Sequence, residues 1–342
     1  MIAILADDLT GALDSAACFA GRGLHTEVAL DPVVIPQVLE DRPDVIAINL
    51  ACRELDAKQA QAATMSALAA LPPGTMLFKK IDSRLKGHIE AELDVTPFLR
   101  ALVVPAIAEF GRLVEAGHVT GFGVETPISI AGRLGRHAAC SIIPDIRSAG
   151  DIDTALRSTR EDGVDLLIGA RGLAEALARQ VSGMAQAKPA NVPAGPALFV
   201  IGSRDPITVE QVENLRDGCP VTYLPAPNGQ LLGEPEAGSG VTLVQAVPGR
   251  QECSAPEVSQ ALADSLVPFL TEPARTLLLS GGATAEAILR RMGISRFRLH
   301  GECVPGLGLA YSDRHCIITK SGGFGTPQTL KSIANTILQK AG

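Results

Sequence analysis

The feature that most constrains the fold is the alternation of short apolar runs with longer helical patterns. Between the runs lie segments such as 55–71, whose Ala-rich composition predicts a helix. Strands that alternate with helices build mostly parallel sheets, so the pattern predicts an α/β fold. In the first half of the chain, strands are predicted at residues 2–6, 26–30, 44–49, 76–81, 101–105 and 164–169.

The chain length and one Pro-rich segment predict two domains. At 342 residues the chain exceeds what one core usually supports, about 250 residues. Residues 182–196 read SGMAQAKPANVPAGP and break the periodicity, which is typical of a linker. We therefore predict two α/β domains with mostly parallel sheets, residues 1–185 and 195–342. In the second half, strands are predicted at residues 197–202, 241–246, 276–282 and 316–325, and helices at 207–216, 258–270 and 328–340.

Composition argues against several functional classes. A net charge of −7, no Trp and only two Tyr argue against a nucleic-acid partner. The seven cysteines form no C-x-x-C pair, so neither a zinc site nor a disulfide framework is predicted. No apolar run reaches the roughly 18 residues of a membrane span, and the N-terminus has no signal-like pattern. We expect a cytoplasmic protein without a membrane partner.

Two adjacent acids follow the first predicted strand in the sequence ILADDLTG. Asp7 and Asp8 would repel each other and lose hydration at the rim of a core, so they require compensation. The start of the next helix and nearby cations, namely Lys80, Arg84 or Lys86, are the expected sources.

The segment KKIDSRLKG follows the predicted strand at 76–81 and concentrates cations. A solvated loop is the plain interpretation. Its position after a buried strand also suits a site for a small anion, in which Arg84 and Lys86 would clamp a carboxylate or phosphate. Arg112, which follows the next strand, is either a surface cation or a member of this cluster. His88 is the histidine of interest, because it lies within the loop.

Glycines follow three predicted strands of the second half. Ligands of open α/β sheets bind at the carboxyl ends of strands, and glycine lets the backbone approach an anion closely. Taken singly each pair favours a turn, whereas three at one sheet edge favour a nucleotide phosphate site of uncommon type. Neither G-x-x-x-x-G-K-[ST] nor a well-placed G-x-G-x-x-G is present. The residues are Gly202-Ser203, Ser280-Gly281-Gly282-Ala283-Thr284 and Lys320-Ser321-Gly322-Gly323-Phe324-Gly325.

These motifs, in this order, resemble those of the four-carbon acid sugar kinases, and the resemblance covers nearly the whole chain. It rests on ADDLTGA at 6–12, KKIDSRLKG at 79–87, PA-x4-GR at 105–112, GSRDPIT at 202–208, SGGATA at 280–285 and TKSGGFG at 319–325.

The resemblance implies a sugar-acid-binding N-terminal domain and a nucleotide-binding C-terminal domain, with the active site in the cleft between them. The implied reaction is ATP-dependent phosphorylation of the terminal hydroxyl of threonate, erythronate, 3-oxotetronate or a similar acid. ATP and Mg²⁺ are the implied cofactors, the metal ligands are open, and a homodimer is one option for assembly. The implied sugar-acid site comprises Asp7, Asp8, Lys80, Asp82, Ser83, Arg84, Lys86, Gly87 and Arg112, and the implied nucleotide site comprises Gly202, Ser203, Gly281, Gly282, Ala283, Thr284, Lys320, Gly322 and Gly323.

The chain departs from the family pattern in two places. Where the family usually has D-S-T-L-R-G-N, residues 82–88 read DSRLKGH, which leaves the identity of the acid open. Where it usually has G-G-D-T, Ala283 replaces a carboxylate. These departures keep a non-catalytic sensor of sugar acid or nucleotide as the alternative function. An aspartate-nucleophile phosphatase is disfavoured, because D-x-D-x-T does not occur at Asp7.

Phosphoryl transfer requires alignment, charge neutralisation and a carboxylate at the attacking hydroxyl. Our hypothesis gives that role to Asp8. Asp7 would then cap the following helix or support the cations. The order of these two roles is left open by the sequence.

Overall fold

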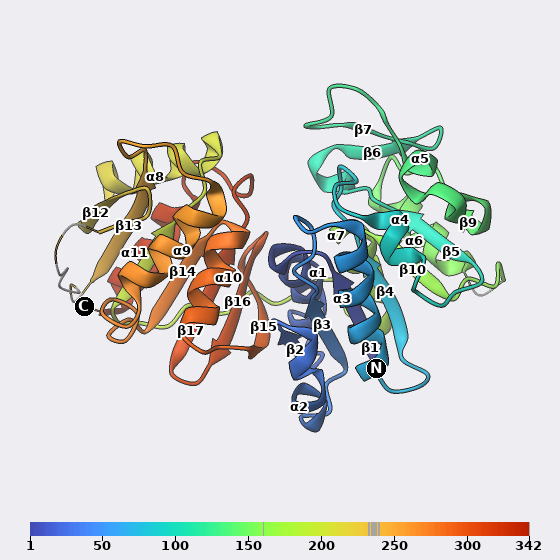
Figure 1. Cartoon of the computed structure of the whole chain (residues 1–342), viewed down its shortest axis with the longest axis horizontal. Helices are drawn as coiled ribbons and strands as arrows, with labels where there is room; N and C mark the ends of the chain where they lie inside the picture. The colour runs from blue at the N-terminus through green and yellow to red at the C-terminus, as the bar shows by residue number, and fades with distance from the viewer. Residues whose placement is uncertain (160, 232, 234–237, 239, 342) are drawn as a thin grey trace. The chain divides into compact units, whose positions relative to one another are not determined.

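The computed structural model describes residues 1–159, 161–231, 233, 238 and 240–341. The chain divides into two compact units, Met1–Lys188 and Pro189–Gly342. The division falls inside the segment 182–196. Figure 1 shows the helices and strands of both units.

The first unit is built on a parallel sheet in which β1 is an interior strand between β3 and β4. Every neighbouring pair in it is parallel. The carboxyl ends of β1, β3 and β4 therefore lie at one edge. In spatial order the strands are β2 (Thr26–Ala29), β3 (Val45–Asn49), β1 (Ile2–Ala6), β4 (Met76–Lys80), β10 (Leu166–Gly169), β5 (Ala101–Val104) and β9 (Ser141–Ile142).

Helices cover this sheet because its interior strands are largely apolar and buried. One core cluster joins Ala3, Leu5, Ile46 and Ile48 to α2 and α3, which therefore cover one face. The helices of this unit are α1 (Leu9–Ala20), α2 (Ile35–Glu40), α3 (Ala57–Ala70), α4 (Ile89–Leu93), α5 (Ile130–Leu134), α6 (Ala149–Ser158) and α7 (Arg171–Ser182), with 3₁₀ turns at Pro32–Val34, Ala108–Phe110 and Gly135–Cys140.

A small antiparallel sheet follows β5. It consists of β6 (Arg112–Glu115), β7 (His118–Gly121) and β8 (Ile128–Ser129). Gly111, in the left-handed region, ends the preceding 3₁₀ turn and lets the chain enter β6. Arg112 is thereby carried on a strand beside the parallel sheet (Figure 1).

The second unit has a sheet of mixed direction. From β12 to β17 neighbouring strands are parallel, and β16 pairs antiparallel with both β17 and β15. The order is β12 (Val221–Pro227), β13 (Val241–Val247), β11 (Ala197–Ile201), β14 (Thr276–Ser280), β17 (His315–Lys320), β16 (Leu307–Ser312) and β15 (Arg296–Val304), and the helices are α8 (Pro206–Gly218), α9 (Ala255–Leu266), α10 (Gly282–Arg291) and α11 (Thr329–Ala341).

The predicted α/β fold with mostly parallel sheets is confirmed, and some predicted boundaries are wrong. The helix predicted at 258–270 ends at Leu266, because the next residue precedes Pro268 and a residue before proline avoids the helical region. The strands predicted at 197–202, 276–282 and 316–325 end before their glycines, which lie in loops or, for Gly282, at the start of α10. The antiparallel strands β15 and β16 were not predicted.

Candidate active site

Asp7 and Asp8 lie between β1 and α1, at the carboxyl edge of the first sheet. Asp8 is the N-cap of α1: its Oδ1 accepts a hydrogen bond from the Gly11 amide at 2.8 Å. Its Oδ2 accepts one from the Thr10 hydroxyl at 2.8 Å. The hypothesis that Asp7 caps the helix is therefore wrong, because the extended backbone at Asp8 aims the Asp8 carboxylate at the first turn.

The cation that compensates both acids is Arg53, which the sequence analysis missed. Its Nε and Nη2 donate to the two carboxylate oxygens of Asp7 at 2.8 and 2.7 Å, and its Nη1 donates to Asp8 Oδ2 at 2.7 Å. The expected compensation by Arg84 or Lys86 is wrong, since both side chains are exposed and it is Arg53 that pairs with the two carboxylates. Fork geometry of this kind is specific to arginine.

Arg53 reaches the acids because of the register of the sheet. The segment after β3 returns to the end of β1, where the Asp7 carbonyl accepts hydrogen bonds from the Cys52 and Arg53 amides at 3.0 and 3.2 Å. The backbone thus fixes this segment independently of the guanidinium. A link of 46 positions from Asp7 has no local sequence signal, so only knowledge of the strand order could have found it.

The two acids differ in exposure. The Asp7 side chain is 3% exposed and that of Asp8 is 22% exposed. Burial alone would raise the pKa of Asp7, but the hydrogen bonds and charge of Arg53, with smaller contributions from Lys79 and Lys80, lower it. Asp7 is thus held as a buried carboxylate, and Asp8 retains a solvent-facing part.

Lys79 and Lys80 take different roles at the end of β4. Lys79 is fully buried and its ammonium contacts the Glu92 carboxylate of α4. Burial disfavours its charge, but Glu92 and Asp7 outweigh this and raise the pKa of Lys79. Lys80 Nζ donates to the Ile81 carbonyl at 3.1 Å and lies beside Gly11, the residue bonded to Asp8. Lys80 is therefore part of the cluster around Asp8, and the buried charge of Lys79 acts on the neighbouring Asp7.

The loop after β4 brings further predicted residues to this edge. Ser83 Oγ accepts a hydrogen bond from Arg112 Nη1 at 2.6 Å, so Arg112 does join the loop. Burial and the nearby charge of Arg84 lower the pKa of Arg112. Gly87 has φ +89°, and a Cβ there would lie 2.5 Å from Asp7 Oδ2. Close approach of the loop to Asp7 thus depends on this glycine.

The remaining loop residues are held less directly. Asp82 Oδ1 accepts a hydrogen bond from the Arg84 amide at 2.8 Å, which forms a local turn. The Arg84 and Lys86 side chains are exposed. His88 Nε2 lies against the Leu55 carbonyl.

In the second unit the three glycine-bearing loops are adjacent, because β14 lies between β11 and β17 in parallel. The Gly281 amide donates to the Lys320 carbonyl at 2.9 Å, and the Gly202 amide donates to the Ser280 carbonyl at 3.0 Å. A Cβ at Gly322 would meet the Ser203 hydroxyl. The predicted nucleotide residues are therefore brought together at one sheet edge.

The α10 N-terminus belongs to this edge. Gly281, with φ +107°, is its N-cap and provides no side-chain cap. The following residues, Gly282, Ala283 and Thr284, form the first turn, in which amides lack helical partners. Ala283 is exposed and Thr284 is buried, with its hydroxyl 3.2 Å from that of Ser259. Such a turn suits an anion.

Lys320 faces inward rather than toward this edge. Its ammonium is fully buried and donates to Thr208 Oγ1 at 2.8 Å, to the Gly322 carbonyl at 3.0 Å and to the Ser321 carbonyl at 3.1 Å. These three acceptors use its three donors. Burial lowers the pKa of Lys320 to about 8. Direct contact of Lys320 with a phosphate, as the resemblance implied, does not fit this geometry.

The carboxylate at the nucleotide edge is Asp205, a second residue that the sequence analysis did not single out. Its Oδ1 caps α8 by accepting from the Ile207 amide at 3.0 Å, and its Oδ2 lies toward Gly323. Within the described residues no cluster of three or more His, Cys, Asp or Glu forms a metal site. A magnesium ion that arrives with nucleotide phosphates requires only one or two carboxylates.

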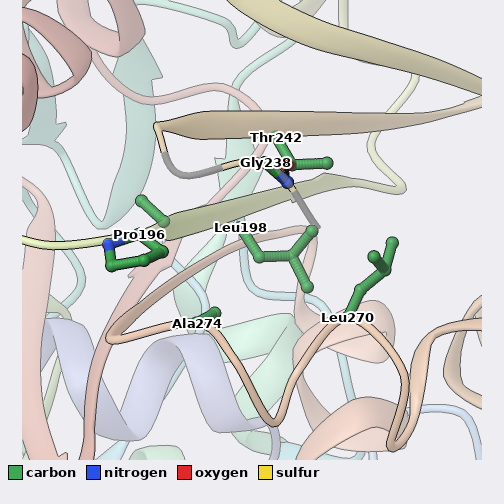
Figure 2. A pocket seen from close by; sticks show the side chains of 7 residues that line it. Pro196, Leu198, Gly238, Thr242, Leu270 and Ala274 are labelled. Atoms are coloured by element: carbon green, nitrogen blue, oxygen red, sulfur yellow. Dashed lines mark hydrogen bonds between the residues drawn. The ribbon is translucent and has the colours of Figure 1, made fainter. Parts of the chain in front are cut away.

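A small pocket in the second unit lies away from the glycine loops. Figure 2 shows its lining, which is mostly apolar and includes Leu198, Thr242 and Leu270. It spans about 190 Å³, including space open to solvent, and lies near the amino ends of β11 and β13. Because ligands of such sheets bind at the carboxyl edge, this pocket does not belong to the site.

Among the described helices, none combines the length and apolar character needed to cross a membrane.

Comparison with known proteins finds one family domain in each half of the chain. A sugar-binding N-terminal domain matches residues 2–129, and a nucleotide-binding C-terminal domain matches residues 234–330. The chain belongs to the four-carbon acid sugar kinase family. Two curated relatives align with nearly the whole chain. D-threonate kinase of Salmonella typhimurium is 26% identical, covering 96% of both chains, and D-threonate kinase of Cupriavidus necator is 27% identical, covering 96% of this chain and 95% of the relative.

The fold is also that of two solved structures. A crystal structure of a Salmonella typhimurium LT2 protein superposes with a TM-score of 0.78 at 18% identity, covering 100% of this chain and 99% of the other. Haemophilus influenzae protein HI1011 has a TM-score of 0.71 at 19% identity, covering 99% of both chains. At these identities the likeness concerns the fold alone.

Proposed function

We propose that this member of the four-carbon acid sugar kinase family uses ATP to phosphorylate the terminal hydroxyl of a four-carbon sugar acid. Relatives are D-threonate, D-erythronate and 3-oxo-tetronate kinases, which supports acids of this size. The observation that carries the proposal is the partly exposed Asp8 carboxylate beside Lys80 at the edge of the first sheet. The predicted homodimer and cytoplasmic location stay predictions.

Asp8 would orient or deprotonate the attacking hydroxyl. Its Oδ1 is fixed by the first turn of α1 and its Oδ2 by Arg53, so the carboxylate is already in place before substrate arrives. Asp7 has no comparable exposure and would act through Arg53. This division assigns the two acids separate roles.

The cations of the first unit would bind the acid group of the substrate. Arg112 is half-buried and anchored to Ser83 and to the Phe122 carbonyl, which leaves it well placed to meet a carboxylate. Arg84 and Lys86 are exposed at the same loop and would complete the anion site. The loop residues Asp82 and Gly87 would shape it.

The carboxyl edge of the second unit would bind the nucleotide phosphates. The first turn of α10 offers free amides, and the glycines at 202, 322 and 323 allow close approach. Asp205 is the residue that would hold Mg²⁺, which when bound neutralises phosphate charge. Lys320 would keep the loop in shape.

The test is ADP release from Mg-ATP over a panel of four-carbon acids that includes D-threonate, D-erythronate and 3-oxotetronate. We expect turnover with at least one of them. Asp8→Asn should reduce kcat at least about 100-fold, because a positioned base contributes about 10² to 10⁴. ATP binding by calorimetry should change little in the same variant. Nucleotide binding without ADP release on any acid would favour the sensor instead.

A further inference from the structure

We propose that Arg53 is a positioning residue that separates the two adjacent acids, so that Asp8 alone is presented to the substrate hydroxyl. The inference rests on the proposed function and extends it to a residue outside every motif of the sequence. Its first support is geometric. One planar guanidinium donates from Nε and Nη2 to Asp7 and from Nη1 to Asp8. Both carboxylates are therefore held in place by one rigid group.

The second support is the charge balance around Asp7. The groups that face it are Arg53, the cations Lys79 and Lys80 of β4, the neighbouring acid Asp8, and Glu92 and Cys52. Glu92 is paired with Lys79, so the charge of Lys79 neutralises Asp7 less than an unpaired cation would. Arg53 is the cation that bonds both acids directly. Without it, two adjacent carboxylates would compete for Lys80 and one would tend to take up a proton.

The third support is that the backbone and the side chain of Arg53 are anchored separately. The amides of Cys52 and Arg53 donate to the Asp7 carbonyl, whereas only the guanidinium reaches the carboxylates. Replacing the side chain should therefore preserve the loop. This separation makes Arg53 suitable for substitution.

A rival role is that Arg53 binds the carboxylate of the sugar acid. Three of its five N–H donors are already given to Asp7 and Asp8, and its side chain is 20% exposed. A substrate clamp would raise KM for the acid when removed. A positioning residue would instead lower kcat and leave that KM nearly unchanged.

The experiment compares Arg53→Met and Arg53→Lys with wild type in ADP release, using an acid that the wild type turns over. We expect Arg53→Met to lose about 100-fold or more in kcat with KM for the acid within about 3-fold, as misplacement of a reacting group predicts. Arg53→Lys should recover part of kcat, because it restores charge but not the fork. The acid limb of the kcat–pH profile should move to higher pH in Arg53→Met.

Arg179→Met is the matched control, since Arg179 also pairs with carboxylates but on α6 and α7, at Asp153 and Glu175. Its kcat should stay near wild type. A large rise in KM with kcat retained in Arg53→Met would overturn the proposal in favour of a substrate clamp.

A second measurement does not depend on turnover. Urea unfolding of Arg53→Met, Asp7→Asn and the double variant should show that the double variant loses less stability than the sum of the two single losses. Losses that simply add would overturn the pairing. If the wild type releases no ADP with any acid, the proposed kinase activity fails, whereas this cycle still decides whether Arg53 holds Asp7.

Discussion

Asp7 is a buried carboxylate, and its environment affects the stability of the first site. Its side chain is 3% exposed, and an unpaired charge at that burial would be costly. The guanidinium of Arg53 provides a bidentate partner, and the pKa of Asp7 is lowered from its ordinary value of 3.8. Ionised Asp7 is therefore part of the folded state rather than a cost to it.

Asp7→Asn should lower the free energy of unfolding at pH 7 by about 1 to 3 kcal/mol, because it removes the ionised partner of Arg53 Nε and Nη2 and leaves Asp8 to balance the guanidinium charge. The lowered pKa means that the stabilisation by Asp7 is complete above about pH 4 and is lost as pH falls through the folded-state pKa. The gap between wild type and Asp7→Asn should therefore narrow at acid pH. Urea unfolding between pH 7 and pH 3 measures it, and a constant gap would contradict this account.

Gly87→Ala should destabilise the chain more than Gly74→Ala. Both glycines have positive φ, +89° and +80°, so both substitutions strain the backbone, by about 1 kcal/mol. Only at Gly87 does the added Cβ meet a side chain, Asp7 Oδ2 at 2.5 Å; nothing lies within 4 Å at Gly74. We expect an extra loss of about 1 to 3 kcal/mol at Gly87. Equal shifts in the urea midpoint would show that the contact does not matter.

At the residue scale, the sequence predicts groups next to strands better than it predicts their partners. Asp7 and Asp8 were found because they follow an apolar run, whereas Ser83 was implied by the family resemblance. Arg53 was missed because its relation to Asp7 depends on β1 and β3 being neighbours, which the local pattern does not contain. Lys320 was predicted as a phosphate contact because a sequence shows a charge but not the direction of the side chain.

At the scale of elements, α8 and β17 together shape the nucleotide loop. Thr208 of α8 accepts from Lys320 and donates to the Gly322 carbonyl at 2.7 Å, while Gln211 donates to the Phe324 and Thr326 carbonyls at 3.1 and 2.9 Å. The loop carbonyls thus turn inward toward α8. These contacts tie the shape of the loop to α8.

Lys320→Met should remove a pH-dependent part of the stability. Because the pKa of Lys320 is lowered from 10.5 to about 8, the folded chain binds fewer protons than the unfolded chain between these values. Stability from this group therefore rises as pH increases from about 8 to 10.5, by up to about 3 kcal/mol. Urea unfolding over this range should show a steeper rise for wild type than for Lys320→Met. The exposed Lys58→Met is the control and should run parallel to wild type.

The elements themselves were largely predictable, because buried parallel strands are continuous apolar runs. Their ends were less so. The three strands with trailing glycines were predicted too long, since glycine in an apolar run does not reveal where the ladder hydrogen bonds stop. The antiparallel β15 alternates buried and exposed residues, Phe297 and Leu299 facing inward, but its polar residues concealed it among loops.

At the scale of the whole molecule, the two compact units carry chemically different sheet edges. The edge of the first unit joins carboxylates to cations, which suits a small hydroxy acid. The edge of the second unit is formed by glycine loops and a helix start, which suits phosphate. Such a separation predicts that substitutions in one unit alter the binding of one substrate only.

Gly323→Asp should weaken ATP binding about 10-fold, since it adds a negative charge where phosphate is proposed to lie. Gly323 is exposed, its φ is ordinary, and a Cβ there would meet only Asp205 Oδ2 at 3.5 Å, so the matched Gly323→Ala should bind ATP like wild type. Arg112→Met should instead weaken binding of the sugar acid and leave ATP unaffected. Calorimetry with each ligand alone measures both. If Gly323→Asp binds ATP normally, the loop at 320–325 is not at the phosphates; equal losses for the Ala and Asp variants would indicate shape rather than charge.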